Sequence, residues 1–407
     1  MNIMGTRTGR MLLLIGLVSA VVLISAIIWN DLNFSFFVAL LFNDVKEFAS
    51  SGTITSNFMP IGYSGFVGSC VKVGGIGSIP ACQAFIYIGI LLAAFWFLKL
   101  GGTRGVLLAL GTLAVALHPM LVLNVWRIHD GNPTVLLLLG FLASGIVFLR
   151  KRDAWSVIIF GVFTGLLLTV RINAILLVLP ALFVVFKKSE EKLTAGAKKA
   201  ILFLVSAMIV FAAVNMAIKQ APIFFPQHGL YNFFAGSNEY TSKYLLKDYS
   251  GENSLGEALK ARGFSSSAET FKGWLSFPSE TYKEFAVDYI KNHPFEYLKL
   301  TALKLFTFFR PGYHMGENFS WDSGEGLKRF SKIILSLPVF AWAFLVYKTR
   351  KSFFDKENVF VLLSAALYLA PFLIANADPR FRFPLDIIFI ADSFRRIGYL
   401  KDNPSTT

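Results

Sequence analysis

The sequence predicts an all-α polytopic membrane protein with about ten transmembrane helices, and three observations support this fold class. Hydrophobic residues make up 55% of the 407-residue chain and charged residues only 16%. The mean hydropathy is +0.59, which is well above the range of soluble globular proteins. Long apolar runs recur along the chain, and basic residues gather in the short segments between them.

The apolar runs define the predicted helices, because each is about long enough to cross roughly 30 Å of hydrocarbon. Two windows are marginal: residues 172–186 form a short run, and the last window contains Asp386 and Asp392. The windows are 11–29, 81–98, 105–123, 133–149, 154–170, 172–186, 200–218, 330–347, 357–375 and 383–398.

The net charge of +14 is spread over short loops, whereas a nucleic-acid-binding protein would need a basic folded domain. With ten spans these loops all fall on one side, which the positive-inside rule identifies as the cytoplasm, together with both termini. The first span lacks a clear cleavage site and is predicted to be an uncleaved anchor. The basic segments are Arg7 to Arg10, Lys99 to Arg104, Arg150 to Arg152, Lys187 to Lys199, Lys348 to Lys356 and Arg395 to Lys401.

The remaining loops face the extracytoplasmic side and divide the chain into three predicted domains. Residues 1–218 form an N-terminal transmembrane module with a catalytic first outer loop at 30–80. Residues 219–329 form an extracytoplasmic loop region that contains an interfacial helix over 299–309, which is too short and too charged to cross the membrane. Residues 330–407 form a C-terminal transmembrane module.

The first outer loop carries the first candidate residues. If its beginning is helical, Asp44 and Glu47 are three positions apart and share one face. Gly52 and the later run Pro60-Ile61-Gly62-Tyr63 predict a break and then a rigid turn that bends the chain back. An ordinary solvated loop is the alternative interpretation.

The two cysteines, Cys70 and Cys82, enclose a glycine-rich segment that is predicted to lie on the outer side. They could form a disulfide in an oxidising compartment. Alternatively, Cys82 could be a small hydrophobic residue inside the second span. The sequence leaves both alternatives open.

Two further polar features interrupt the apolar sequence on the outer side. The turn 124–132 follows the break at Leu117-His118-Pro119 and gathers four polar residues between two predicted helices, Arg127, His129, Asp130 and Asn132. A lone arginine would more simply reach toward the membrane surface, but four polar residues together indicate a site. Arg171 lies in apolar sequence, where facing lipid at the bilayer centre would cost about 3 kcal/mol. We therefore expect Arg171 to have an anionic partner, either a phosphate or an outer carboxylate.

Residues 376–384 form the sharpest pattern near the C-terminus. Pro379 and Pro384 are predicted to frame an extended piece, in which Arg380 and Arg382 share one face. The two arginines could bind a phosphate, each through a pair of hydrogen bonds. They could equally anchor the helix to anionic headgroups, and both interpretations remain open.

The order of these features resembles that of GT-C-type membrane glycosyltransferases, which include lipid A aminoarabinose transferases and protein O-mannosyltransferases. The resemblance spans nearly the whole chain, although each motif is short and the paired acids are the wider Asp44-x-x-Glu47 in place of a tight pair. The motifs are Asp44 with Pro60-x-Gly62-Tyr63, Leu117-His118-Pro119, Gly165 to Pro180 around Arg171, Gly236-Ser237-Asn238, Tyr289 to Pro294 with Lys299 and Lys304, and Arg380 to Pro384.

The resemblance implies a GT-C-like fold and an enzyme that transfers a sugar, with inversion, from a polyprenyl-phosphate donor to a glycan, lipid or protein acceptor. We expect it to act on the extracytoplasmic face of a bacterial or archaeal plasma membrane. Three groups of residues carry the implied roles, namely a base with supporting acids, donor-phosphate contacts, and sugar or acceptor contacts. They are Asp44, Glu47 and Asp130; Arg171, Arg380 and Arg382; and Tyr63, His129 and Asn238.

No cofactor is required by the sequence. A divalent metal could bind the paired acids, but the histidines and acids show no ligand spacing that requires one. Two other function classes stay open. A carrier-lipid-dependent glycan polymerase or ligase would also place arginines on a lipid phosphate, and a lipid or glycolipid transporter would be expected to carry internal repeats, which the sequence does not show.

Overall fold

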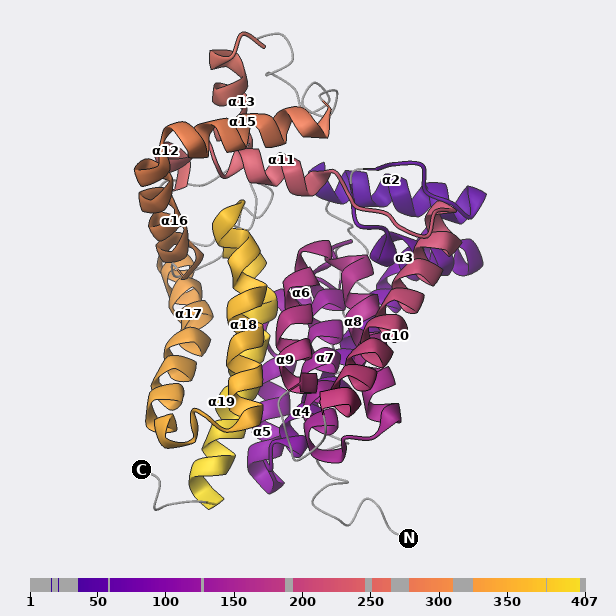
Figure 1. Cartoon of the computed structure of the whole chain (residues 1–407), viewed down its shortest axis with the longest axis vertical. Coiled ribbons are helices and arrows are strands. Elements are labelled where there is room, and N and C mark those ends of the chain that lie inside the picture. The colour runs from indigo at the N-terminus through magenta and orange to yellow at the C-terminus, as the bar shows by residue number, and fades with distance from the viewer. Residues whose placement is uncertain are drawn as a thin grey trace.

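The computed structural model describes residues 36–57, 59–125, 128–186, 193–245, 251–264, 278–309, 325–377 and 379–402, together with positions 16 and 21. Every regular element within these residues is a helix, which confirms the predicted all-α class. Figure 1 shows an elongated helical bundle with further helices, among them α2, α11 and α15, lying across one end. We call this end the capped end.

The bundle consists of helices that run roughly along its long axis (Figure 1). Among the described residues, four helices are long and apolar enough to cross a membrane, namely Ile76–Leu100, Gly131–Lys151, Thr194–Lys219 and Lys356–Ile374. The bundle helices are α4 (Ile79–Leu100), α5 (Gly105–Ala116), α6 (Pro119–Leu123), α7 (Gly131–Lys151), α8 (Ala154–Val170), α9 (Val178–Phe186), α10 (Leu193–Lys219), α17 (Glu325–Lys348), α18 (Lys356–Ile374) and α19 (Phe383–Asp402).

Aromatic side chains fill the centre of the bundle. The rings of Phe141, Phe160 and Phe360 pack against one another with centroids 5.0 to 5.8 Å apart, and Phe203 continues this cluster at 5.1 Å from Phe160. These four residues come from α7, α8, α18 and α10. Their mutual packing holds the N-terminal and C-terminal parts of the chain in one bundle.

The capped end is built from α2 (Phe36–Ser51), α3 (Ile61–Gly74), α11 (His228–Ala235), α12 (Thr241–Leu245), α13 (Gly251–Ala261) and α15 (Ser279–Asn292). Helix α2 contains both Asp44 and Glu47, and Gly52 follows it at φ 77°, a conformation that glycine adopts readily. A small core that includes Phe234, Leu255 and Tyr282 joins α11, α13 and α15.

The cap is attached to the bundle at the end of α18. The carbonyl oxygen of Ile374 accepts hydrogen bonds from Ser237 Oγ (3.1 Å), the Tyr297 hydroxyl (3.0 Å) and Lys304 Nζ (3.0 Å). Tyr297 and Lys304 belong to α16 (Pro294–Phe309), which extends the helix predicted over residues 299–309. These hydrogen bonds satisfy a helix C-terminal carbonyl that has no partner within the helix.

The segment Pro60 to Tyr63 begins a helix, so the predicted rigid turn is wrong. Pro60 precedes the first residue of α3 with φ −60° and ψ 134°, a conformation that suits the position just before a helix. A Cβ at Gly62 would lie 2.3 Å from Thr169 Oγ1. Glycine therefore allows the start of α3 to pack directly on the end of α8.

Residues Pro379–Arg382 form the 3₁₀ helix η5, so the predicted extended piece is also wrong. A proline fits the first turn of a helix, because its fixed φ is helical and its missing N–H would have no partner there. Arg380 and Arg382 therefore do not alternate with their neighbours as they would in a strand. The side chain of Arg380 lies outside the described part of the structure.

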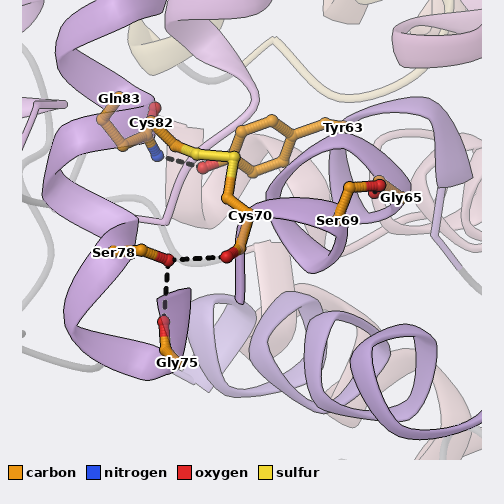
Figure 2. Close-up of a disulfide and its surroundings, with 8 residues drawn as sticks. All are labelled: Tyr63, Gly65, Ser69, Cys70, Gly75, Ser78, Cys82 and Gln83. Atoms are coloured by element: carbon orange, nitrogen blue, oxygen red, sulfur yellow. Dashed lines mark hydrogen bonds between the residues drawn. A yellow bond between two sulfur atoms is a disulfide. The ribbon is translucent and has the colours of Figure 1, made fainter. Parts of the chain in front are cut away.

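Cys70 of α3 and Cys82 of α4 form a disulfide, which decides between the two alternatives left by the sequence. Cys82 lies in the first turn of α4 and is nevertheless paired. Figure 2 shows the disulfide beside the hydrogen bond that Gln83 Nε2 donates to the Tyr63 hydroxyl. Ser78 Oγ donates to the carbonyl of Cys70 at 2.9 Å, so the short link between α3 and α4 is held at several points.

Candidate functional site

Most of the predicted site residues lie in two polar clusters at the capped end. The first, here called the Asp44 cluster, consists of Asp44 and Glu47 of α2, Ser56 of the following loop, and Lys219 at the end of α10. The second, here called the Arg171 cluster, consists of Tyr63, His129, Asp130, Thr134 and Arg171.

Asp44 is a buried carboxylic acid, with only 4% of its surface exposed. Burial, and to a lesser extent the negative charge of Glu47, raises the pKa of Asp44 to about 7, while the hydrogen bond from Ser56 and the charge of Lys219 act in the opposite direction. A carboxyl group with this pKa exchanges a proton near neutral pH, which is what a general base requires.

The loop between α2 and α3 is hydrogen-bonded to two members of the Asp44 cluster, Glu47 and Lys219. Thr55 N donates to Glu47 Oε1 at 2.8 Å, and Lys219 Nζ donates to the carbonyls of Thr55 (2.8 Å) and Ser56 (2.7 Å). Lys219 is not among the site residues predicted from the sequence. The sequence does contain a sign that Lys219 is unusual. It is a basic residue at the outer end of an apolar window, and the positive-inside rule places basic residues at the inner end.

Arg171 pairs with Asp130 in the Arg171 cluster. Arg171 Nη2 donates to Asp130 Oδ1 at 2.8 Å, and the two side chains are only 8% and 14% exposed. Arg171 Nε approaches Thr134 Oγ1 at 3.4 Å, and the guanidinium lies 5.4 Å from the ring centre of Phe381. The anionic partner expected for Arg171 is thus a carboxylate of the polar turn, held at the start of α7.

His129 and Tyr63 extend the Arg171 cluster toward α3. The Tyr63 hydroxyl accepts hydrogen bonds from His129 N (3.0 Å) and from Gln83 Nε2. His129 Nδ1 accepts from Gly131 N at 2.9 Å, which leaves the ring proton on Nε2 when the imidazole is neutral. Burial raises the pKa of Tyr63, so this residue acts as a neutral hydrogen-bonding group.

His228 and Tyr368 lie within electrostatic range of Asp130 and Arg171, and neither is among the site residues predicted from the sequence. His228 begins α11, directly after the prolines that open the loop region. Burial, and then the positive charge of Arg171, lowers the pKa of His228 to about 4, against the opposing charge of Asp130. His228 is therefore neutral at physiological pH.

Two other predicted residues are occupied by contacts within the protein. Arg382 is fully buried, and its Nε donates to both oxygens of Asp386 at 3.0 and 3.1 Å, while Nη1 donates to the carbonyl of Phe308 at 3.1 Å. Asn238 Nδ2 donates to the carbonyl of Phe234 at 2.8 Å, and its Oδ1 accepts from Tyr240 N at 2.9 Å. Asn238 thus orders the turn between α11 and α12.

The structure brings together Tyr63, His129, Asp130 and Arg171, and separately Asp44 and Glu47. Neither Arg171 nor Arg382 is among the interaction partners described for Asp44. Among the predicted site residues, the acid and the guanidinium that form an ion pair are Asp130 and Arg171. Within the described ranges, three or more histidine, cysteine or acidic side chains do not come together in a way that could hold a metal ion.

Comparison of the chain with protein-family models, curated proteins and solved structures finds no match. The assignment of function therefore depends on the chemistry of the two clusters.

Proposed function

We propose that this protein is an integral membrane glycosyltransferase of the GT-C type, which moves a sugar from a polyprenyl-phosphate donor to a glycan, lipid or protein acceptor. The observation that supports this proposal most directly is the buried Asp44, whose pKa is raised to about 7 at the polar end of an apolar bundle. A lipid-linked donor presents its reacting carbon where hydrocarbon meets water, which is the position that this end of the bundle would occupy.

The proposed topology has ten spans. It comprises the four long helices, the four shorter apolar helices Gly105–Ala116, Ala154–Val170, Ile172–Phe186 and Ser336–Lys348, α19, and the window 11–29, which lies outside the described residues except at positions 16 and 21. The capped end is then extracytoplasmic. The basic segments that end α4 and α7 lie at the opposite end of the bundle (Figure 1), in agreement with the positive-inside rule.

In the proposed reaction, Asp44 takes the proton of the acceptor hydroxyl as that oxygen attacks the anomeric carbon. The bond from the anomeric carbon to the phosphate oxygen breaks, and polyprenyl phosphate leaves with the bonding electron pair. Inversion follows, because the acceptor and the leaving phosphate lie on opposite faces of the sugar. Glu47 keeps the pKa of Asp44 high through its negative charge.

Arg171 is the proposed contact for the leaving phosphate. Its guanidinium carries five N–H donors, and the hydrogen bonds described for it use only Nε and Nη2. Asp130 holds the guanidinium in place, and donors on Nη1 remain for a phosphate oxygen, where they would stabilise charge that develops in the transition state. Arg382 is a weaker candidate, because Asp386 already neutralises it.

Mass spectrometry of envelope glycans and glycolipids tests this function. Cells that lack the protein are expected to lose one sugar substituent, which wild type and the control Asp288→Asn restore and Asp44→Asn does not. Asp288 is an exposed acid on α15, so it tests whether any loss of an acid at the capped end has the same effect. Full restoration by Asp44→Asn would instead favour a carrier-lipid polymerase or ligase, and lipid flipping by purified protein without sugar transfer would favour a transporter.

A further inference from the structure

Three buried side chains near the Arg171 cluster carry a polar atom for which the described protein supplies no hydrogen-bond partner. The atoms are the Tyr368 hydroxyl, Asn124 Nδ2 and Asn132 Oδ1. Tyr368 and Asn124 are each 1% exposed, and Asn132 is fully buried. Buried polar atoms in folded proteins are nearly always hydrogen-bonded, so each of these three atoms is expected to have a partner from outside the described protein.

Asn124 and Asn132 belong to the polar turn that holds Asp130. A Cβ placed on Gly131 would lie 3.0 Å from Asn124 Nδ2, 2.8 Å from His129 Nδ1 and 3.1 Å from Phe383 Cδ1. The amide nitrogen, the imidazole and the aromatic ring therefore converge on the backbone next to Asp130. Asn132 Nδ2 is fixed by the carbonyl of Leu121 at 3.1 Å, which determines where its Oδ1 points.

Tyr368 approaches the same region from α18. Arg171 and Asp130 are both close enough to act electrostatically on Tyr368, and a row of aromatic contacts connects Tyr368 to Arg171. The ring of Tyr368 packs 5.5 Å from Phe372, Phe372 stacks 5.0 Å from Phe381, and Phe381 lies 5.4 Å from the Arg171 guanidinium. A row of packed aromatic rings thus leads from Tyr368 to the ion pair.

The chemistry of these groups fits an uncharged, hydroxyl-rich ligand. An amide N–H donates, an amide oxygen accepts, and a phenol can do either, so together they match the hydroxyl groups of a sugar. Asp130 and Arg171 neutralise each other, and His228 is neutral because its pKa is lowered to about 4. A few polar groups held in fixed positions beside aromatic rings are the kind of contact that orients a small ligand.

We propose that Tyr368, Asn124 and Asn132 bind the sugar ring of the lipid-linked donor, beside the phosphate contact Arg171. This inference rests on the proposed function and adds to it the residues that select the sugar.

The test compares two tyrosine-to-phenylalanine variants that each remove one buried oxygen. Tyr368→Phe removes a hydroxyl without a described protein partner, whereas Tyr87→Phe removes a hydroxyl that donates to the carbonyl of Ala116 at 3.0 Å. Both side chains are 1% exposed. We expect Tyr87→Phe to lower the thermal midpoint and leave ligand binding unchanged, because a buried carbonyl loses its partner. We expect Tyr368→Phe to leave the thermal midpoint unchanged or raised and to weaken sugar binding.

The binding measurement uses purified protein in nanodiscs, with plain polyprenyl phosphate and a panel of polyprenyl-phosphate hexoses and pentoses as probes. For the sugar-bearing lipid that binds most tightly to wild type, Tyr368→Phe and Asn124→Ala are each expected to raise Kd about two- to tenfold, the range for loss of one hydrogen bond. Their Kd for plain polyprenyl phosphate should stay at the wild-type value.

The outcomes separate the two proposals. If the protein binds polyprenyl phosphate but no sugar headgroup improves the affinity, or if both variants bind the preferred sugar lipid as wild type does, the sugar subsite is refuted and the proposed function stands. Equal weakening toward the plain and the sugar-bearing lipid also refutes the subsite. If the wild-type protein binds no polyprenyl phosphate at all, the proposed function fails and the subsite fails with it.

Discussion

Replacing Asp44 with Asn is expected to stabilise the fold at alkaline pH while abolishing transfer. In the unfolded chain the carboxyl group titrates near 3.8, whereas in the folded protein its pKa is raised to about 7. Above pH 7 the group is charged in both states, and the folded state carries the cost of a buried charge. The difference between the two pKa values corresponds to about 4 kcal/mol, at about 1.36 kcal/mol per unit.

The sign of this effect follows from the raised pKa. The gain from Asp44→Asn is fully present above pH 7, shrinks as the folded carboxyl group takes up its proton, and vanishes below pH 3.8. We expect a gain of about 4 kcal/mol at pH 8 and about 2 kcal/mol at pH 5.

The assay is thermal or denaturant unfolding of the purified protein at both pH values, with Asp288→Asn as the matched control. Asp288 is exposed, so its substitution should change stability little at either pH. The reasoning is refuted if Asp44→Asn is less stable than wild type at pH 8, or if its gain does not depend on pH.

Three further predictions concern contacts that hold the capped end together. Asp130→Asn should destabilise the protein by about 2 to 3 kcal/mol, because it leaves the Arg171 guanidinium partly buried without its counter-charge, and adding Arg171→Gln should recover part of that loss in a double-mutant cycle of unfolding free energies. Arg382→Ala should cost about 3 to 5 kcal/mol, because it removes the guanidinium that pairs with the buried carboxylate of Asp386. A smaller loss together with a specific loss of donor binding would restore the predicted role of Arg382 in phosphate binding. Cys70→Ala should lower stability by about 3 kcal/mol, as expected for opening a short disulfide loop, and a thermal midpoint equal to that of wild type in non-reducing buffer would contradict this.

The sequence predicted the bundle helices well where composition alone defines them. The window 154–170 coincides with α8 (Ala154–Val170), and the break predicted at His118-Pro119 separates α5 from α6. The last window was marginal because of its two acids. The structure pairs Asp386 with Arg382, and Asp392 with Arg395 and Arg396, so both charges are neutralised within the bundle.

Helix α3 could not be predicted in the same way. It contains Gly62, Gly65 and Gly68, and glycine is unfavourable in an isolated helix. Glycines spaced three apart lie on neighbouring positions of a helix surface, and here they contact Thr169, Ile218 and Phe48 respectively. The helix is therefore stabilised by close packing with other parts of the chain, which local composition does not reveal.

The pairing of the site residues was also only partly predictable. The apolar surroundings of Arg171 indicated that it needs an anionic partner, but Asp130 lies 41 positions away in the chain, and their contact depends on how α7 packs on α8. The same holds for His228 and Tyr368, which come from the cap and from α18. These residues were not predicted to be neighbours because they lie far apart in the sequence, although their side chains have the chemistry expected at a polar site.

The pH dependence of sugar transfer tests the central claim, that Asp44 is the base, most directly. Wild-type kcat/KM from a polyprenyl-phosphate sugar donor should fall on the acid side with a midpoint near pH 7, because Asp44 must lose its proton to act and its pKa is about 7. Glu47→Gln removes a charge that raises this pKa, and Lys219→Gln removes a charge that lowers it, so the midpoint should move to lower pH in the first variant and to higher pH in the second. A profile that stays flat through neutral pH, or two variants that move it in the same direction, would contradict the account.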